Sequence, residues 1–280
     1  PAVFGAAVYQ INMVIGTLLA SLLPEGSVSY LYYADRLVQF PLGIFAIATA
    51  TAVLPSLSKQ VAAEDYDGLR ETFCHAMNFV FFITIPAMMG LIVLREPIIY
   101  LLFKRGAFNA DTVRLTAEAL LYYCAGLWAF SAVRIVVSMF YALQDTKTPV
   151  KMAIISIVVN IVMGIVLMGP LKHGGLALAT SLASIVNLLL LVWALRRKIG
   201  MLGWRLIMAS AGRSLGISLV MGAAVWGTSL MVIPRGDHSF LQLLLGVTGT
   251  ITAGVAVYAL LGAFFGSPEL DRLVKALRRR

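Results

Sequence analysis

Two charged side chains and an amide lie close together in a stretch of chain that is otherwise apolar. Asp35, Arg36 and Gln39 fall inside a predicted membrane span, and the chain stays almost wholly apolar from 42 to 54. Arg36 follows Val28 by eight positions, which is roughly 12 Å along a helix. A charge at that depth costs about 2.5–3.5 kcal/mol and persists where it faces protein or a water-filled cavity. The sequence therefore predicts a functional site around Arg36.

Arg36 has two interpretations. In a structural role it pairs with a carboxylate or a carbonyl and locks two helices together. In a functional role it faces a cavity and binds an anionic group such as phosphate, which suits the forked donors of a guanidinium. Asp35 and Arg36 are about 100° apart on a helix, so at most one of them points squarely into a cavity. Gln39 shares the face of Arg36, and Pro41 is expected to open the backbone nearby.

Three further polar residues interrupt predicted spans. Arg134 is either a second contact for an anion or a packing residue that pairs with Glu118 or another span. Asn160 and Thr180 are expected to form interhelical hydrogen bonds. A cation site is the alternative for these two residues, but hard cations usually take at least one carboxylate and neither span offers one.

The sequence predicts no catalytic or metal site and no cofactor. Cys74 and Cys124 fall in or beside apolar runs without a partner motif, so we expect inert buried thiols. The histidines His75, His173 and His238 never approach the spacing of metal ligands.

Composition assigns the chain to the polytopic, all-α membrane proteins. It is 60% hydrophobic and only 12% charged, about half the charged share of a soluble domain. The apolar runs have the length of membrane helices rather than of barrel strands. About eight transmembrane helices are predicted, over residues 2–23, 28–55, 73–103, 113–142, 149–169, 174–195, 212–233 and 240–265. Pro41, Pro55 and Pro86 should kink or break their spans.

Most of the 22 Lys and Arg residues cluster at one set of span ends. The positive-inside rule makes this side cytoplasmic and places the C-terminus there. Segment 57–72 is expected to be a cytoplasmic link that contains a short surface helix. Segment 196–213 and the basic tail after Pro268 suit an anionic lipid surface, so the charge of +9 requires no nucleic acid. Because Pro1 is not an initiator residue, we expect a fragment that lacks upstream helices.

Three motifs carry a resemblance to a known family. They are Gly26-Ser27-Val28-Ser29-Tyr30-Leu31-Tyr32-Tyr33-Ala34-Asp35-Arg36-Leu37, Phe140-Tyr141-Ala142-Leu143-Gln144-Asp145-Thr146-Lys147-Thr148-Pro149-Val150-Lys151 and Gly169-Pro170-Leu171-Lys172-His173-Gly174-Gly175-Leu176-Ala177-Leu178-Ala179-Thr180-Ser181. On these residues the chain resembles the MurJ (MviN) family of lipid II flippases, within the multidrug/oligosaccharidyl-lipid/polysaccharide exporter superfamily. The likeness covers essentially the whole chain.

The resemblance implies a family fold of fourteen transmembrane helices, of which this chain would supply the seventh to the last. Residues 1–198 would form the second lobe of about six helices. Residues 199–280 would form an interfacial segment, two C-terminal helices with a groove for the polyprenyl tail, and a basic cytoplasmic tail. The partner lobe would be the missing N-terminal lobe of the same protein.

The implied activity is alternating-access transport of lipid II, an undecaprenyl-diphosphate-linked peptidoglycan precursor, across the bacterial cytoplasmic membrane. Arg36 matches the family's cavity arginine that engages the headgroup, and Asp35 is its motif neighbour. Some members hold sodium with acids at places that correspond here to Gly16 and Gly164, so we do not expect sodium binding.

Three alternatives remain open. One is a polysaccharide-lipid or drug exporter of the same superfamily, against which the motifs at 33–36 and 144–147 argue. A membrane enzyme acting on polyprenyl phosphates would need histidines beside the acids at 64–71. A scaffold that binds lipid without moving it is the third.

Overall fold

The chain is all-α, as predicted. The computed structural model describes residues 2–106, 108–200, 203–233 and 240–271, and these ranges contain helices and turns but no strand. The helices, in chain order, are α1 (Ala2–Ser21), α2 (Ser27–Pro41), the π-helical segment η1 (Leu42–Ile47), α3 (Ala48–Ala62), α4 (Tyr66–Val93), α5 (Arg95–Phe103), α6 (Ala110–Cys124), α7 (Leu127–Ala142), α8 (Lys147–Ile199), α9 (Trp204–Val232) and α10 (Phe240–Phe264).

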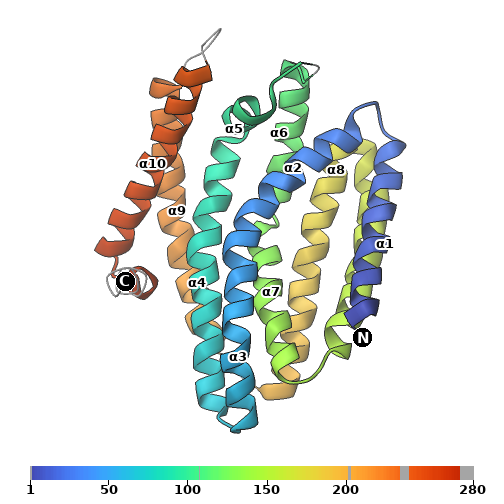
Figure 1. The fold of residues 1–280 in the computed structure, drawn as a ribbon, viewed down its shortest axis with the longest axis vertical. Coiled ribbons are helices and arrows are strands. Elements are labelled where there is room, and N and C mark those ends of the chain that lie inside the picture. Colours follow the sequence, from blue (N-terminus) through green and yellow to red (C-terminus); the bar gives the residue numbers. More distant parts are fainter. Residues whose placement is uncertain (1, 107, 201–202, 234–239, 272–280) are drawn as a thin grey trace.

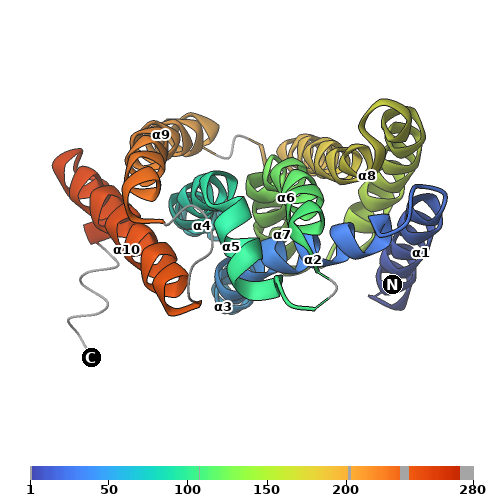
Figure 2. The same cartoon turned by 90° about the horizontal axis from the view of Figure 1, so that it is seen from above.

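The long helices run side by side and form a flattened bundle (Figure 1). Seen from above, α1 and one part of α8 lie at one end of the molecule, and α9 and α10 lie at the other (Figure 2). Helices α4, α6 and α7 lie between these ends, and the main apolar core is built largely from them. Helix α2 crosses α6 and continues into α3 along α4 and α7.

The expected number of spans is higher than the number that the structure supports. By length and composition, five of the described helices can cross a membrane, or six when α6 and α7, bent by 44°, count as one span. Two predicted spans fall within α8, whose 53 residues form two helices joined at the non-helical Lys172 and are counted once. Helix α1 is not counted, because only Asn12–Ser21 qualifies as an apolar helix and it is shorter than a span. These two helices account for most of the difference.

The three prolines do not break their helices. Pro41 is the last residue of α2, and the chain continues through the π-helical turns of η1 into α3. A π-helical turn absorbs an irregularity within a helix at the cost of regular hydrogen bonds. Pro55 and Pro86 lie inside α3 and α4, which continue past them.

The predicted cytoplasmic link at 57–72 is instead the meeting point of two helices. Helix α3 runs to Ala62 and α4 begins at Tyr66, because charged residues extend a helix beyond the apolar region when their propensity is helical. Asp65 is the N-cap of α4, and its carboxylate accepts a hydrogen bond of 2.9 Å from the Gly68 amide. The interfacial helix expected at 196–213 is likewise divided between the end of α8 and the start of α9. Residues 272–280 of the predicted tail lie outside the described ranges.

The hydroxyl group of Ser181 provides a hydrogen-bond partner for backbone carbonyl groups where α6 meets α7. Ser181 on α8 donates a hydrogen bond of 2.7 Å to the Tyr122 carbonyl and lies 3.3 Å from the Tyr123 carbonyl. A Cβ atom on Gly126 would lie only 2.8 Å from the Cα atom of Ser181. Glycine therefore allows α8 to approach this bend closely, and a serine replaces the partners that the bend removes.

Helix α8 folds back on itself within the motif at 169–181 (Figure 1). Lys172 has φ 48° and ψ −129°, which is outside the helical range. The buried His173 follows, and its Nε2 atom lies 2.9 Å from the Leu115 carbonyl while its ring packs edge-on against Tyr30. A Cβ atom on Gly175 would lie 2.2 Å from the Leu167 carbonyl oxygen. The corner is thus closed by backbone contact and joined to α2 and α6.

Asp145, in the motif at 140–151, joins the two ends of α8. The Asp145 carboxylate accepts hydrogen bonds from the Thr148 amide (3.0 Å) and hydroxyl (2.7 Å) at the start of α8. It also accepts one of 2.7 Å from Lys198 in the last turn of α8. Desolvation alone would raise the pKa of Asp145, but the bonds from Lys198 and Thr148 outweigh it and lower the pKa to about 2. Asp145 is therefore ionised at neutral pH and fixes the α7–α8 turn.

Helices α9 and α10 pack beside α4 around a separate, smaller core that includes Phe82, Met221 and Tyr258. The Tyr258 hydroxyl donates 2.8 Å to the Phe82 carbonyl. Ser210 donates 2.8 Å to the buried Glu269, which anchors the chain after α10. This separate core supports a boundary near 198, which stays a prediction.

We predict that Gly175→Ala destabilises the protein by about 1–3 kcal/mol, because the added methyl group would overlap a backbone oxygen. Gly169→Ala, on the same helix with open space around its Cα atom, is the matched control and should be neutral. Thermal unfolding of the purified protein in detergent measures both. Equal melting temperatures for the two variants would contradict the close packing at the corner.

We predict that Asp145→Asn lowers stability at pH 7 by about 1 kcal/mol. The folded-state pKa of about 2 lies below the ~3.9 of an unfolded aspartate. The carboxylate therefore stabilises the fold above pH ~4 and loses this effect as the pH falls toward 2. Melting temperatures of parent and variant should accordingly converge in acid. Asp67→Asn, at a carboxylate 96% exposed, is the control; a pH-independent difference for Asp145→Asn would contradict the assignment.

Candidate functional site

Arg36 stands on an exposed and otherwise apolar face of the long helix that includes α2, η1 and α3. The exposed side chains around it follow helical spacing: Val28, Tyr32, Phe40, Ile44 and Ile47. Its guanidinium lies over the Tyr32 ring, 4.8 Å from the ring centroid. Arg36 makes no hydrogen bond or ion pair with any residue that the structure describes. The site thus offers an accessible guanidinium with its donors free.

Asp35 turns away from Arg36. The Gln39 side-chain amide donates a hydrogen bond to the Oδ2 atom of Asp35. The prediction that Gln39 shares the face of Arg36 is therefore wrong for its side chain, because the spacing of four residues brings it to Asp35. The prediction that only one of the adjacent charges lines a given cavity agrees with the structure.

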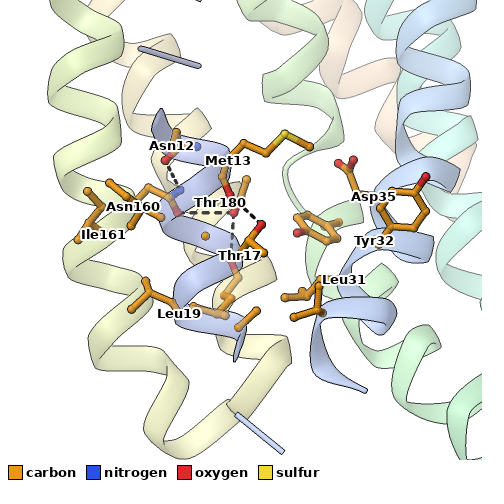
Figure 3. A pocket seen from close by; sticks show the side chains of 16 residues that line it. Asn12, Met13, Thr17, Leu19, Leu31, Tyr32, Asp35, Asn160, Ile161 and Thr180 are labelled. Carbon is orange, nitrogen blue, oxygen red and sulfur yellow. Dashed lines mark hydrogen bonds between the residues drawn. The ribbon is translucent and has the colours of Figure 1, made fainter. Parts of the chain in front are cut away.

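Asp35 and Tyr32 form one side of a pocket of about 220 Å³ between α1, α2 and α8 (Figure 3). The other side carries Asn12, Asn160 and Thr180. Apolar residues including Leu19, Leu31 and Leu176 complete the lining, and Arg36 is not part of it. The cavity beside the motif is therefore lined by the carboxylate, where the sequence had favoured the guanidinium.

Asn160 bonds Thr180 directly, and it also bonds Asn12, a residue that the sequence had not singled out. The Asn160 amide donates 2.9 Å to the Asn12 Oδ1 atom on α1, and the Thr180 hydroxyl lies 3.5 Å from the Asn160 Oδ1 atom. The Thr180 hydroxyl also bonds the Leu176 carbonyl at 3.0 Å. A polar residue inside an apolar span, such as Asn12, could have indicated this hydrogen bond from the sequence. The geometry fits the expectation of interhelical hydrogen bonds.

Arg134 lies apart from this pocket. It is exposed on α7 and does not line the cavity that contains Asp35. Within the described residues no ion pair joins it to Glu118, so the proposed packing pair with Glu118 is absent there. Cys74 and Cys124 are both buried, as expected. Among the described residues no cluster of His, Cys, Asp and Glu could hold a metal ion.

Comparison with known proteins resolves the family. The model of the family described as "Lipid II flippase MurJ" matches residues 1–247. The Vibrio cholerae protein named "Probable lipid II flippase MurJ" is 39% identical over 266 residues, which is 92% of this chain and 49% of the relative. A Haemophilus influenzae protein of the same name is 37% identical over 81% of this chain and 45% of its own length.

The chain belongs to the MurJ family. It spans about half the length of the curated relatives it matches. A MurJ structure in an inward closed conformation aligns with a TM-score of 0.77 at 28% identity, over 93% of this chain and 52% of that structure. An outward-facing MATE transporter aligns with a TM-score of 0.62 at 14% identity, over 98% of this chain and 64% of its own length, which shows a shared fold only.

In this MurJ-family pocket, neutral side chains of α1 and α8 bond one another and the Asp35 carboxylate lies on the α2 side, and the absence of sodium binding stays a prediction. The Asn160 amide is already bonded to Asn12, and Asp35 is bonded to Gln39. No carboxylate joins Asn12, Asn160 and Thr180 in the hydrogen bonds of the described chain, although a hard cation usually takes one. Gly16 lines the pocket without adding a ligand group, and a Cβ atom on Gly164 would contact Leu176 and Leu19.

We predict a coupling energy of about 0.6 kcal/mol, and at most about 1.7, between Asn12→Ala and Asn160→Ala, as for other hydrogen bonds between membrane helices. Unfolding of the two single variants and the double variant in detergent measures it. Asn12→Ala combined with Thr252→Val on α10, whose hydroxyl bonds the Thr248 carbonyl, is the control and should be additive. Replacing sodium by potassium should leave stability unchanged. A sodium-dependent melting temperature would contradict the interpretation that Asn12, Asn160 and Thr180 form only neutral hydrogen bonds between α1 and α8.

Proposed function

We propose that this chain forms the second lobe and the two C-terminal helices of a lipid II flippase. In this proposal it moves an undecaprenyl-diphosphate-linked peptidoglycan precursor across the bacterial cytoplasmic membrane by alternating access, together with a first lobe. Membership of the MurJ family supports the substrate class. The proposal assigns no catalytic step to the chain.

The placement of Arg36 is the observation that carries the proposal. An unpaired guanidinium on an apolar face is costly in a lipid environment, so this face is expected to meet a partner lobe or a water-filled cavity. A diphosphate satisfies several guanidinium donors at once, more strongly than a neutral acceptor does. Arg36 is therefore proposed to bind the diphosphate as it crosses the membrane.

The other predicted site residues receive different roles. Gln39 donates a hydrogen bond to Asp35 and so fixes that carboxylate beside the pocket. The exposed Arg134 on α7 is proposed as a second contact for the anion, since it lacks the expected pair with Glu118 in the described chain. Asn160 and Thr180 join α8 to α1 through Asn12 and bind no ion in this proposal.

The polyprenyl tail is assigned to the C-terminal helices. Helices α9 and α10 expose large apolar side chains, which include Trp226, Leu245, Val255 and Leu260. Such a surface suits a hydrocarbon chain as well as it suits bilayer lipid. The headgroup and the tail would thus contact different parts of the chain.

The proposed orientation places the turn at 143–146 and the end of α8 in the cytoplasm, with the C-terminus on the same side. Arg197 lies over the exposed Trp193 at 4.0 Å, and Arg196 and Arg205 are exposed nearby. Arginine and tryptophan together suit the headgroup region of an anionic leaflet. Inner-leaflet lipids are therefore proposed as further partners.

A polysaccharide-lipid or drug exporter is the competing function. The likeness to MATE transporters reflects the fold alone, because the identity is 14%. The exposed guanidinium of Arg36 suits an anionic diphosphate better than a cationic drug.

We predict that Arg36→Gln lowers transport about 10- to 100-fold, because a charge-assisted hydrogen bond contributes roughly 1.5–3 kcal/mol. The assay joins residues 1–280 to the first half of the Vibrio cholerae relative and tests growth after depletion of the host flippase. Lys59→Gln, on the cytoplasmic turn of α3, is the control and should support growth. Growth with Arg36→Gln at the parent rate would exclude the headgroup role, and failure of the unaltered chimera would contradict the proposed function.

A further inference from the structure

We propose that the pocket between α1, α2 and α8 binds one sugar ring of the headgroup while Arg36 binds the diphosphate. This inference rests on the proposed function and adds a glycosyl subsite to it. The subsite includes Tyr32, Asp35, Thr17 and Tyr123, which all line the pocket.

The size of the pocket fits a single ring. Its volume is about 220 Å³, below the roughly 300–1,000 Å³ of sites that enclose a drug-sized ligand. The pocket is therefore too small for a complete disaccharide-peptide headgroup.

The lining has the chemistry that a pyranose requires. A sugar ring has an apolar face, which packs on an aromatic ring, and hydroxyl groups, which need acceptors and donors. Tyr32 and Tyr123 supply aromatic rings, and Asp35 and Thr17 supply oxygen atoms. Apolar side chains such as Leu31 and Ile161 cover the rest. Mixed aromatic, carboxylate and hydroxyl groups on an apolar wall favour a sugar over a lipid tail.

The hydrogen bonds of Asp35 leave one acceptor available. Gln39 bonds the Oδ2 atom, and the Oδ1 atom has no hydrogen bond within the described residues. A carboxylate that is fixed at one oxygen presents the other in a defined direction, which suits a sugar hydroxyl. The Thr17 hydroxyl donates 2.9 Å to the Met13 carbonyl and so keeps its own lone pairs for a ligand. Both acceptors are held in place before a ligand arrives.

Tyr32 connects the pocket with Arg36. Its ring lines the cavity, and the Arg36 guanidinium lies over it at 4.8 Å. Figure 3 shows Tyr32 and Asp35 together on one side of the pocket, facing the polar group around Thr180. In a glycosyl diphosphate the ring is bonded directly to the phosphate. The covalent order of the ligand therefore matches the spatial order from the pocket across Tyr32 to Arg36.

Binding measurements with two lipids test the subsite. The chimeric transporter described above is placed in nanodiscs, and its affinity is measured for lipid II and for undecaprenyl diphosphate, which lacks the sugars. Asp35→Asn and Thr17→Val should each weaken lipid II binding about two- to tenfold, the range of one hydrogen bond. Thr17→Val should leave the affinity for undecaprenyl diphosphate unchanged, and Asp35→Asn should not lower it, because it removes a negative charge beside Arg36. Thr51→Val, at an exposed threonine on α3 that bonds the Ile47 carbonyl outside the pocket, is the matched control.

The outcomes separate this inference from the proposed function. Arg36→Gln should weaken both lipids, and an unchanged affinity for both would overturn the proposed function itself. If Asp35→Asn and Thr17→Val weaken both lipids equally, or neither lipid, while Arg36→Gln weakens both, the glycosyl subsite is wrong and the headgroup role of Arg36 stands. Two independent variants keep the test decisive if one of them fails to fold.

Discussion

An ionised guanidinium on an apolar helix face carries a large free-energy cost in lipid, and the structure must therefore provide it with a stabilising environment. Arg36 has Tyr32 beneath it, and the nearest carboxylate, Asp35, is bonded to Gln39. A cation–π contact at an exposed site contributes about 0.5–1 kcal/mol, less than the cost of the charge in lipid. The remaining stabilisation must come from water, a partner lobe or a bound anion. The proposed affinity of Arg36 for an anion would be strongest where the protein excludes water.

The rest of the fold holds that charge at a fixed position. Helix α2 is joined to α8 and α6 through the Tyr30–His173 packing and the His173 contact with the Leu115 carbonyl. Asp145 ties the two ends of α8 together, and Asn160 ties α8 to α1. These contacts link helices that are distant in sequence, so the lobe is expected to move as one body. The π-helical segment after α2 is the local irregularity closest to Arg36, and such turns are frequent at functional sites.

The sequence predicted the helical class, because hydropathy is a local property, and the role that it assigned to Arg36 stays a prediction. It did not predict which neighbour of Arg36 would line the pocket, since this depends on how α1 and α8 pack against α2. The pairing of Asn12 with Asn160 was missed for the same reason, because these residues are 148 positions apart. Segment 57–72 was misjudged because its polar residues suit an exposed helix as well as a loop. Spans were therefore more predictable than contacts.

A photo-crosslinker placed one helical turn from Arg36 tests most directly whether this face meets the lipid headgroup. Phe40 is 68% exposed on the same face, so its replacement leaves the guanidinium intact. We predict that a crosslinker at Phe40 labels lipid II and that Arg36→Gln abolishes the labelling. A crosslinker at Leu189, an exposed residue of α8, should label bulk phospholipid irrespective of Arg36. Labelling of lipid II from position 40 that is unchanged by Arg36→Gln would contradict the central claim.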